Sequence, residues 1–137
     1  MLYLIIGIPG SGKSTLASKI QNEILEKSGN LIKIYEADMY FTKNGKYEWN
    51  VDNLGAAHFW CQKMTENELK LGNSVIVSNT SIRKRDRKIY IDLAKKYHHE
   101  IKVITCRGEF KNIHNVPQDK IAKMKERFQE FSEEELI

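Results

Sequence analysis

The sequence predicts an α/β fold in which a small parallel sheet of about four strands is covered by helices on both faces. Short apolar runs alternate with longer amphipathic stretches, and a glycine-rich turn joins the first run to the first amphipathic stretch. Strands that alternate with helices favour parallel pairing with right-handed crossovers. Because the chain has 137 residues and shows no repeats or linkers, we expect a single domain over residues 1–137.

The first strand and the first helix are predicted from apolar spacing. Residues 2–6 are typical of a buried parallel strand, because the run is short, rich in large apolar residues and closed by a glycine. The apolar residues of the next stretch recur at helical spacing: Leu16, Ala17, Ile20 and Ile24. Gly29 then provides a stop signal, so we expect this helix to end there.

The remaining elements follow in the same alternation. We expect strands over residues 31–35, 74–78 and 101–105, with a small hairpin-like loop over 40–49 around an Asn44-Gly45 turn. Asn50 is typical of a helix cap, and apolar residues at helical spacing then predict a long helix that ends at Gly72. A helix over 84–97 and a last helix from Pro117 that includes Phe128 and Phe131 complete the pattern, and residues 132–136 are expected to fray.

Residues 7–14 match the phosphate-binding motif G-x-x-x-x-G-K-[ST] between the predicted first strand and helix. Backbone N–H groups of such a turn, with the positive end of the helix macrodipole, converge on an anion. We expect Lys13 to reach the terminal phosphates and the Ser14 hydroxyl to bind Mg²⁺. The expected partner is ATP or another purine nucleoside triphosphate, and its expected binding residues are Gly10, Ser11, Gly12, Lys13, Ser14 and Thr15.

Ligands of parallel α/β sheets bind outside the carboxyl ends of the strands. This rule selects the residues that follow each predicted strand: the phosphate loop, Asp38, Asn79-Thr80-Ser81 and residues 107–114. Asp38 is a candidate general base for a hydroxyl that attacks the γ-phosphate, and a turn cap or a magnesium-ordering group is the alternative. Residues 106–116 are predicted to form a lid. Arg107 and Lys111 are its candidate cations for the phosphates, and an ordinary solvated loop is the alternative. His114 is a weaker candidate.

Two surface features favour an anionic polymer as acceptor. Basic residues cluster where the third helix is expected to begin: Arg83, Lys84, Arg85, Arg87 and Lys88. Positive charge there opposes the macrodipole, so either a polynucleotide backbone compensates it or the cluster is a solvated face. Aromatic residues and lysines interleave over 40–49, where they either stack on bases or pack on the domain. His58 shares a stripe with apolar residues and is expected to be buried, with a substrate contact as the alternative.

The composition excludes several classes of protein. A net charge of +4 and a pI near 9.0 mildly favour anionic partners. The chain has two cysteines and no C-x-x-C pair, which predicts a reducing, cytoplasmic compartment. No run is long enough to cross a bilayer, and the N-terminal apolar run lacks the basic leader of a secretory signal. We therefore expect no membrane partner.

Beyond the residues themselves, the chain resembles the polynucleotide 5′-hydroxyl kinase branch of the P-loop kinases, which includes phage-encoded members and short stand-alone AAA-type ATP-binding proteins. The motifs that carry the resemblance are the phosphate loop, Glu36-Ala37-Asp38 with Tyr40-Phe41, residues 45–50, Ala57-His58, Asn79-Thr80, Asn112-Ile113-His114-Asn115-Val116-Pro117 and residues 120–128. The resemblance spans nearly the whole chain. It implies a P-loop NTPase fold with a short lid, and a location in the cytoplasm, that of the host cell for phage-encoded members.

The resemblance also implies roles for single residues. Asp38 falls at the position of the general base toward a 5′-hydroxyl, and Val116 at a position that packs against adenine. Arg107 and Lys111 fall at lid positions where arginines contact the phosphates. Three positions depart from the family: Lys111 replaces an arginine, Phe41 replaces an acceptor-binding arginine, and Ser78 stands where animal members have aspartate.

The sequence as a whole predicts a Mg²⁺- and ATP-dependent kinase that transfers the γ-phosphate to a hydroxyl. The favoured acceptor is the 5′-hydroxyl of a polynucleotide, and the expected catalytic residues are Lys13, Asp38, Arg107 and Lys111. One alternative keeps the chemistry and changes the acceptor to a nucleoside, a modified DNA base or another small hydroxylated molecule. The other alternative is a non-catalytic ATP-binding regulatory module.

Overall fold

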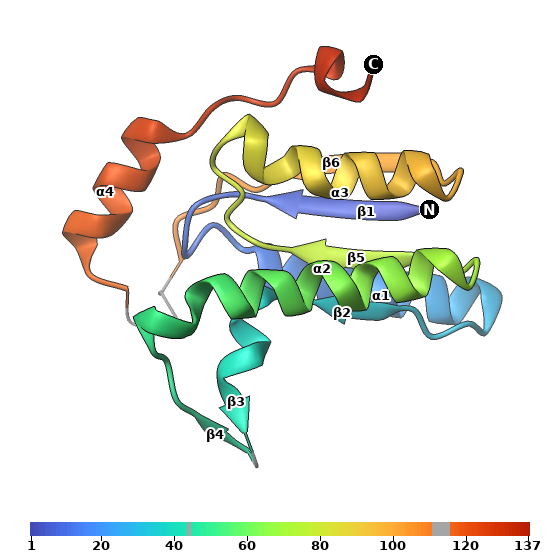
Figure 1. Ribbon diagram of the computed structural model, residues 1–137, viewed down its shortest axis with the longest axis horizontal. Helices are drawn as coiled ribbons and strands as arrows, with labels where there is room; N and C mark the ends of the chain where they lie inside the picture. The colour runs from blue at the N-terminus through green and yellow to red at the C-terminus, as the bar shows by residue number, and fades with distance from the viewer. Residues whose placement is uncertain (44, 111–115) are drawn as a thin grey trace.

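A computed structural model describes residues 1–43, 45–110 and 116–137 and contains the predicted parallel sheet (Figure 1). The sheet has four strands in the order β2-β5-β1-β6, and every neighbouring pair is parallel. Its strands are β1 (Leu2–Ile6), β2 (Lys33–Tyr35), β5 (Val75–Ser78) and β6 (Ile101–Thr105). The helices are α1 (Lys13–Ser28), α2 (Leu54–Lys70), α3 (Lys84–Lys96) and α4 (Gln118–Arg127). The α/β prediction with about four strands is confirmed.

Helices cover both faces of the sheet because successive side chains of a strand point to opposite sides. Ile5 and Ile76 pack with Ala17 of α1 on one face. On the other face, Leu4 and Val77 belong to a larger cluster to which α2 and α3 contribute. The central strands β1 and β5 are therefore buried on both sides, which explains their uninterrupted apolar sequences.

The segment between β2 and α2 projects from the sheet as a small subdomain. It contains a 3₁₀ helix, η1 (Ala37–Phe41), the antiparallel strands β3 (Thr42–Lys43) and β4 (Lys46–Tyr47), and a second 3₁₀ turn, η2 (Val51–Asn53). The hairpin predicted over 40–49 is present. Asn50 caps as predicted, but it caps η2, where its Oδ1 accepts from the Asp52 N–H at 2.9 Å.

The carboxyl-terminal segment differs from its prediction. Helix α4 ends at Arg127, so Phe128 and Phe131 lie beyond it, although both pack against the core under α3. Residues predicted to fray instead form a 3₁₀ helix, η3 (Glu133–Leu136). Two contacts explain this order: Ser132 and Glu135 form a capping box within the segment, and Glu135 pairs with Arg87 of α3 and ties the segment to the domain.

All parallel strands end at the edge where α1 and α3 begin, and α4 lies beside this carboxyl edge. Within the described ranges, no helix is long and apolar enough to cross a membrane.

Candidate functional site

The phosphate loop, residues 7–14, connects β1 to the first turn of α1, as predicted. Gly10 and Gly12 have φ of +80° and +97°, a left-handed conformation that glycine adopts without strain. The Gly12 carbonyl accepts from the Leu16 N–H at 3.0 Å, so the loop leads directly into the helix. The remaining amides of the first turn stay available to an anion, as they do at helix N-termini generally.

Two polar side chains of the phosphate loop, Lys13 and Ser11, differ in their contacts. Lys13 Nζ donates to the Ile8 carbonyl at 3.0 Å, which places the ammonium across the loop. Burial lowers the pKa of Lys13, and nearby Cys106 and Glu36 oppose that shift. The Ser11 hydroxyl oxygen is buried and makes no hydrogen bond to any described residue. Lys13 is therefore the side chain of the loop that suits a phosphate oxygen as a partner.

Glu36, at the end of β2, is the site residue whose role sequence reasoning missed. The Ser14 hydroxyl donates to Glu36 Oε1 at 2.8 Å, which joins the start of α1 to the end of β2. The described ranges hold no group of three or more His, Cys, Asp or Glu residues that would form a metal cage. Mg²⁺ at a nucleotide needs only one or two protein oxygens beside the phosphates, and Ser14 with Glu36 fits that requirement.

Asp38, the candidate base, lies in η1 directly after this strand end. Tyr47 from β4 donates its hydroxyl hydrogen to Asp38 Oδ1 at 2.7 Å, so the hairpin orients the carboxylate. Burial, followed by the hydrogen bond to Asp38, raises the pKa of Tyr47, and the phenol stays protonated as a donor. Tyr47 was not predicted to touch Asp38, because the contact depends on how the hairpin folds back.

Asn79, which follows β5, positions the Asp38 segment. Its Oδ1 accepts from the Ala37 N–H at 2.8 Å, and its Nδ2 is 3.5 Å from the Tyr90 hydroxyl oxygen. Asn79 is buried, so these contacts fix the end of β2 against the end of β5. Ser78 is also buried, and its hydroxyl oxygen makes no hydrogen bond within the described ranges.

The described part of the predicted lid lies against the phosphate loop. The Gly108 N–H donates to the Ser11 carbonyl at 3.1 Å, and the Phe110 N–H donates to the Gly10 carbonyl at 2.7 Å. The Phe110 ring lies over Gly12, where an added Cβ would come within 3.1 Å of it. This segment therefore packs against the loop that is expected to bind the phosphates.

Arg107, the first candidate lid cation, makes a bidentate ion pair with Glu130 beyond α4. Both side chains are exposed, and the hydrogen bond from Arg107 lowers the pKa of Glu130. Lys111 and His114 lie outside the described residues. Val116 is described and half-buried, just before α4.

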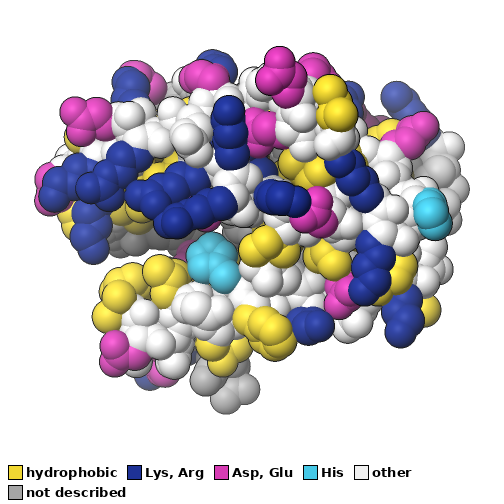
Figure 2. All heavy atoms as spheres, turned by 45° about the horizontal axis from the view of Figure 1, so that its top comes forward, with side chains coloured by type: hydrophobic (Ala, Val, Ile, Leu, Met, Phe, Trp, Pro, Cys, Tyr) yellow, Lys and Arg dark blue, Asp and Glu magenta, His cyan; other side chains and the backbone are white. Residues whose placement is uncertain are grey.

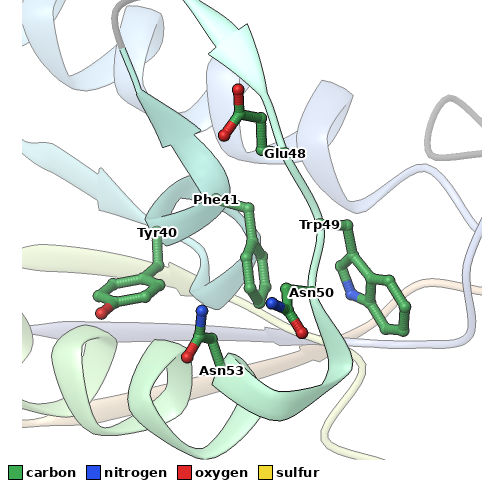
Figure 3. Close-up of a pocket in the computed structure, with 6 residues that line it drawn as sticks. All are labelled: Tyr40, Phe41, Glu48, Trp49, Asn50 and Asn53. Atoms are coloured by element: carbon green, nitrogen blue, oxygen red, sulfur yellow. The ribbon is translucent and has the colours of Figure 1, made fainter.

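A pocket of about 220 Å³ opens beside the Asp38 segment. It is lined by Tyr40, Phe41, Glu48, Trp49, Asn50 and Asn53 (Figure 3). The two asparagine amides lie at the foot of the Phe41 ring, while the Glu48 carboxylate points away from the other five side chains. Aromatic faces with amide donors and acceptors are the groups that bind a flat heterocycle.

The interleaved aromatics of this loop divide between two roles. Phe41 is 3% exposed and contacts the rings of Tyr40, Tyr47 and Trp49, so it packs on the domain. Trp49 is 50% exposed, and Lys120 of α4 lies over its ring at 5.9 Å from the centroid. His58 was predicted to be buried, which is wrong: it is exposed on α2.

The basic cluster at the start of α3 contains one buried residue as well as residues at the surface. Arg87 is fully buried and donates to Ser81 O, Gln129 O and the Glu135 carboxylate, so its prediction as a surface residue is wrong. Lys88 pairs with Asp92 one turn along the same helix. Arg83 and Arg85 line a cavity at the surface with Arg127 of α4, which sequence reasoning did not connect with them.

Comparisons with known proteins bear on the family and the fold of the chain. Residues 2–131 match the family model described as an AAA domain. The chain is 35% identical over 143 residues to human NEDD4-binding protein 2, a match that covers 96% of this chain and 8% of that protein. The chain thus spans a small part of that relative.

Two solved structures share the fold at low sequence identity. Kti12 of Chaetomium thermophilum, solved in complex with ADP-AlF3, has a TM-score of 0.73 at 15% identity, over 95% of this chain and 81% of that one. The Mycobacterium tuberculosis APS kinase CysC, in complex with AMPPNP and APS, has a TM-score of 0.58 at 15% identity, over 89% of this chain and 66% of that one. Both likenesses concern the fold alone.

Proposed function

The chain belongs to the AAA domain family, and from this premise we propose that it is an ATP-dependent kinase that transfers the γ-phosphate to a hydroxyl group. The observation that carries the proposal is the junction of three strand ends. Ser14 after β1 bonds Glu36 at the end of β2, and Asn79 after β5 bonds Ala37, next to Asp38. A phosphate site and a carboxylate are thereby held on one edge of the sheet.

The donor side of the reaction rests on the phosphate loop. Its backbone amides and Lys13 bind the triphosphate, and Arg107 and Lys111 of the predicted lid supply further positive charge. Ser14 and Glu36 are the residues that would hold Mg²⁺, which would neutralise phosphate charge there. Val116 packs beside the purine. The ligands named for the two fold neighbours, ADP-AlF3 and AMPPNP, support nucleotide binding by this fold.

On the acceptor side, Asp38 takes the proton of the attacking hydroxyl. The hydroxyl oxygen forms a bond to the γ-phosphorus, the bond from that phosphorus to the bridging oxygen breaks, and ADP leaves. Tyr47 holds Asp38 Oδ1 at 2.7 Å and so keeps the carboxylate oriented for this transfer. General-base assistance of this kind contributes about a hundred- to ten-thousand-fold in rate.

The favoured acceptor is the 5′-hydroxyl of a polynucleotide. The pocket beside Asp38 offers aromatic rings and amides to the terminal base, and base stacking contributes about 1 to 3 kcal/mol. Its volume of about 220 Å³ is below the range of roughly 300 to 1,000 Å³ typical of whole ligands, so it accepts one base. The same volume favours a nucleoside or a modified base as a second candidate acceptor.

The test is transfer of label from γ-labelled ATP to 5′-hydroxyl oligonucleotides, nucleosides and modified-base DNA. We expect labelled oligonucleotide ends, and we expect Asp38→Asn to lower transfer by about a hundredfold or more while nucleotide binding persists. Asp52→Asn is the matched control, since Asp52 is an exposed carboxylate of the neighbouring turn.

Label on small acceptors alone would select the second candidate. Nucleotide binding without transfer to any acceptor would contradict the kinase proposal and favour a regulatory module.

A further inference from the structure

We propose that a groove between α3 and α4 binds the phosphodiester backbone of a single-stranded polynucleotide acceptor. This arginine groove is a surface cavity of about 480 Å³ lined by Arg83, Arg85, Arg127 and Gln129. Figure 2 shows Lys and Arg side chains gathered at the left of this face of the molecule. The inference rests on the proposed function, because it assigns the class of acceptor for the same reaction.

The groove is held together by Gln129. Its Oε1 accepts from the Lys84 N–H at 2.8 Å, and its N–H donates to the Ile82 carbonyl at 2.7 Å. Gln129 therefore binds the chain just before α3 and the first residue of that helix. This junction fixes Arg127, two residues earlier, beside Arg83 and Arg85.

A buried cation stabilises the same junction. Arg87 has no exposed surface, and its Nη2 donates to the Gln129 carbonyl at 2.7 Å. Its Nε and Nη2 also donate to the Glu135 carboxylate at 3.0 and 3.1 Å. A buried charge is costly unless its hydrogen bonds are satisfied, so this arrangement commits the carboxyl-terminal segment to one position.

The three arginines of the groove are available to an external anion. Within residues 1–43, 45–110 and 116–137, none of them forms an ion pair with a carboxylate. The nearby Asp86 carboxylate accepts from the Arg83 backbone N–H instead. Guanidinium groups brought together without carboxylates repel one another, and bidentate binding to phosphate oxygens relieves that repulsion.

The groove lies next to the reactive edge of the sheet. The Thr80 carbonyl, after β5, accepts from the Gly7 N–H of the phosphate loop at 3.1 Å. Arg83 follows three residues later, so at most about 11 Å of extended chain separates it from that contact. A polynucleotide whose 5′ end lies at Asp38 therefore reaches the arginine groove within a few nucleotides of that end.

Helix α4 connects the groove with the aromatic hairpin. Lys120 lies over the Trp49 ring, and Arg127 stands seven residues later on the same face of the helix. Seven residues correspond to about 10.5 Å of helix, or roughly three nucleotide steps at a stacked spacing of about 3.4 Å. An exposed aromatic ring beside a row of cations is the arrangement that binds single strands.

The first experiment measures binding of a 5′-hydroxyl hexanucleotide by fluorescence anisotropy at several salt concentrations. The test variant combines Arg83→Gln, Arg85→Gln and Arg127→Gln. The matched control combines Lys19→Gln, Lys27→Gln and Lys33→Gln, which removes the same charge from exposed positions on α1 and β2. Thermal unfolding checks both, and Arg85→Gln alone serves if the triple variant does not fold.

Each lost phosphate contact lowers the slope of log affinity against log salt by about 0.7 for a single strand, so we expect the triple variant to lose about 2 units. Arg85→Gln alone is expected to lose about 0.7. An unchanged slope, an equal loss in the control, or no binding by the unaltered protein overturns the inference.

The second experiment measures phosphate transfer against acceptor length. The unaltered protein is expected to have a KM for the hexanucleotide at least about tenfold below that for a dinucleotide, and the triple variant is expected to lose this advantage. The KM for the dinucleotide changes less than about twofold, because that acceptor does not reach Arg127.

The two proposals fail in different ways. Phosphate transfer that does not depend on acceptor length would support the kinase proposal and overturn the proposal that the arginine groove binds the acceptor. Salt-dependent binding through the three arginines, without transfer to any acceptor, supports the groove and overturns the kinase.

Discussion

The starts of α1 and α3 are two candidate anion sites on the same edge of the sheet, built in different ways. Both helices follow neighbouring parallel strands, β1 and β5. At α1 the anion-binding groups are contiguous: a glycine turn with φ near +80° to +97°, followed by Lys13. At α3 they are side chains from two segments, Arg83 and Arg85 on one and Arg127 on the other.

This difference teaches what kind of site a sequence reveals. A loop that binds through backbone amides must have glycines at fixed spacing, so its eight-residue motif can be recognised in the sequence. A groove that binds through side chains requires only that the fold bring them together. At α3 that requirement is met by Arg87, which is buried, and by Gln129, which bonds the helix start.

The largest effect is expected from Lys13→Ala, which disrupts the site at the start of α1 alone. Lys13→Ala removes the ammonium that reaches the terminal phosphates, and we expect kcat/KM to fall by about a thousandfold or more. Oligonucleotide binding at the arginine groove is expected to persist. Transfer kinetics and anisotropy check this, with Lys19→Ala as an exposed control on the same helix. Normal kinetics in the Lys13 variant would contradict the phosphate-loop assignment.

The next largest effect is expected when Arg87, which holds the carboxyl-terminal segment against α3, is replaced. Arg87→Met removes the buried cation and leaves the largely buried Glu135 carboxylate without its partner, which costs about 3 to 5 kcal/mol of stability. Denaturant unfolding measures the loss. Lys88→Met is the control, because the exposed Lys88–Asp92 pair contributes only about 0.3 to 0.5 kcal/mol. Equal losses in the two variants would show that Arg87 does not hold the segment.

A smaller effect tests the same support through pH. Burial alone would raise the pKa of Glu135, but hydrogen bonds from Arg87 and from the Ser132 N–H outweigh it and lower that pKa below its usual value of 4.5. The stabilisation is therefore complete above the unfolded pKa and is lost as the pH falls through the lower folded value. We expect Glu135→Gln to cost about 1.5 to 3 kcal/mol at pH 7.

The difference between Glu135→Gln and the unaltered protein should close in acid, as urea unfolding at pH 7 and near pH 3 will show. Glu133→Gln, an exposed neighbour, is the control. A gap that stays constant with pH would mean that the ion pair does not carry the stabilisation.

The smallest expected effect concerns the lid. Glu130→Gln removes the carboxylate that holds Arg107, so the guanidinium becomes available to the nucleotide. We expect nucleotide affinity to rise by at most about fivefold, since exposed ion pairs are weak. Titration calorimetry with a non-hydrolysable ATP analogue measures this, with Glu133→Gln as the control. Weaker nucleotide binding would indicate that Glu130 positions Arg107 for the phosphates.

The fold was largely predictable from the sequence, because its central strands β1 and β5 are apolar on both faces and its helices have regular apolar spacing. The predicted strands over 74–78 and 101–105 correspond to β5 and β6. The carboxyl-terminal segment was predicted to fray, although Ser132 and Glu135 form a capping box within it, which is a local signal for a helical turn. Its position on the domain was not predictable, because that depends on Glu135 meeting Arg87, which is 48 residues away in the chain.

The candidate site divides in the same way. Asp38 and Asn79 were selected because each follows a strand, and Asn79 does hold the Asp38 segment through Ala37. The partners of these residues were not selected: Tyr47 reaches Asp38 only because β4 folds back along β3. His58 was misassigned because apolar spacing predicts a helix face without saying how far along the helix the core extends.

The sequence by itself determined the parallel sheet, the phosphate loop and the order of the elements, because each depends on residues that are near one another in the chain. Only the tertiary structure decided which cations are available to a ligand. It buried Arg87, paired Arg107 with Glu130 and brought Arg127 to Arg83 and Arg85. The physical reason is that the environment of a charge is set by what packs around it, and those neighbours come from distant parts of the chain.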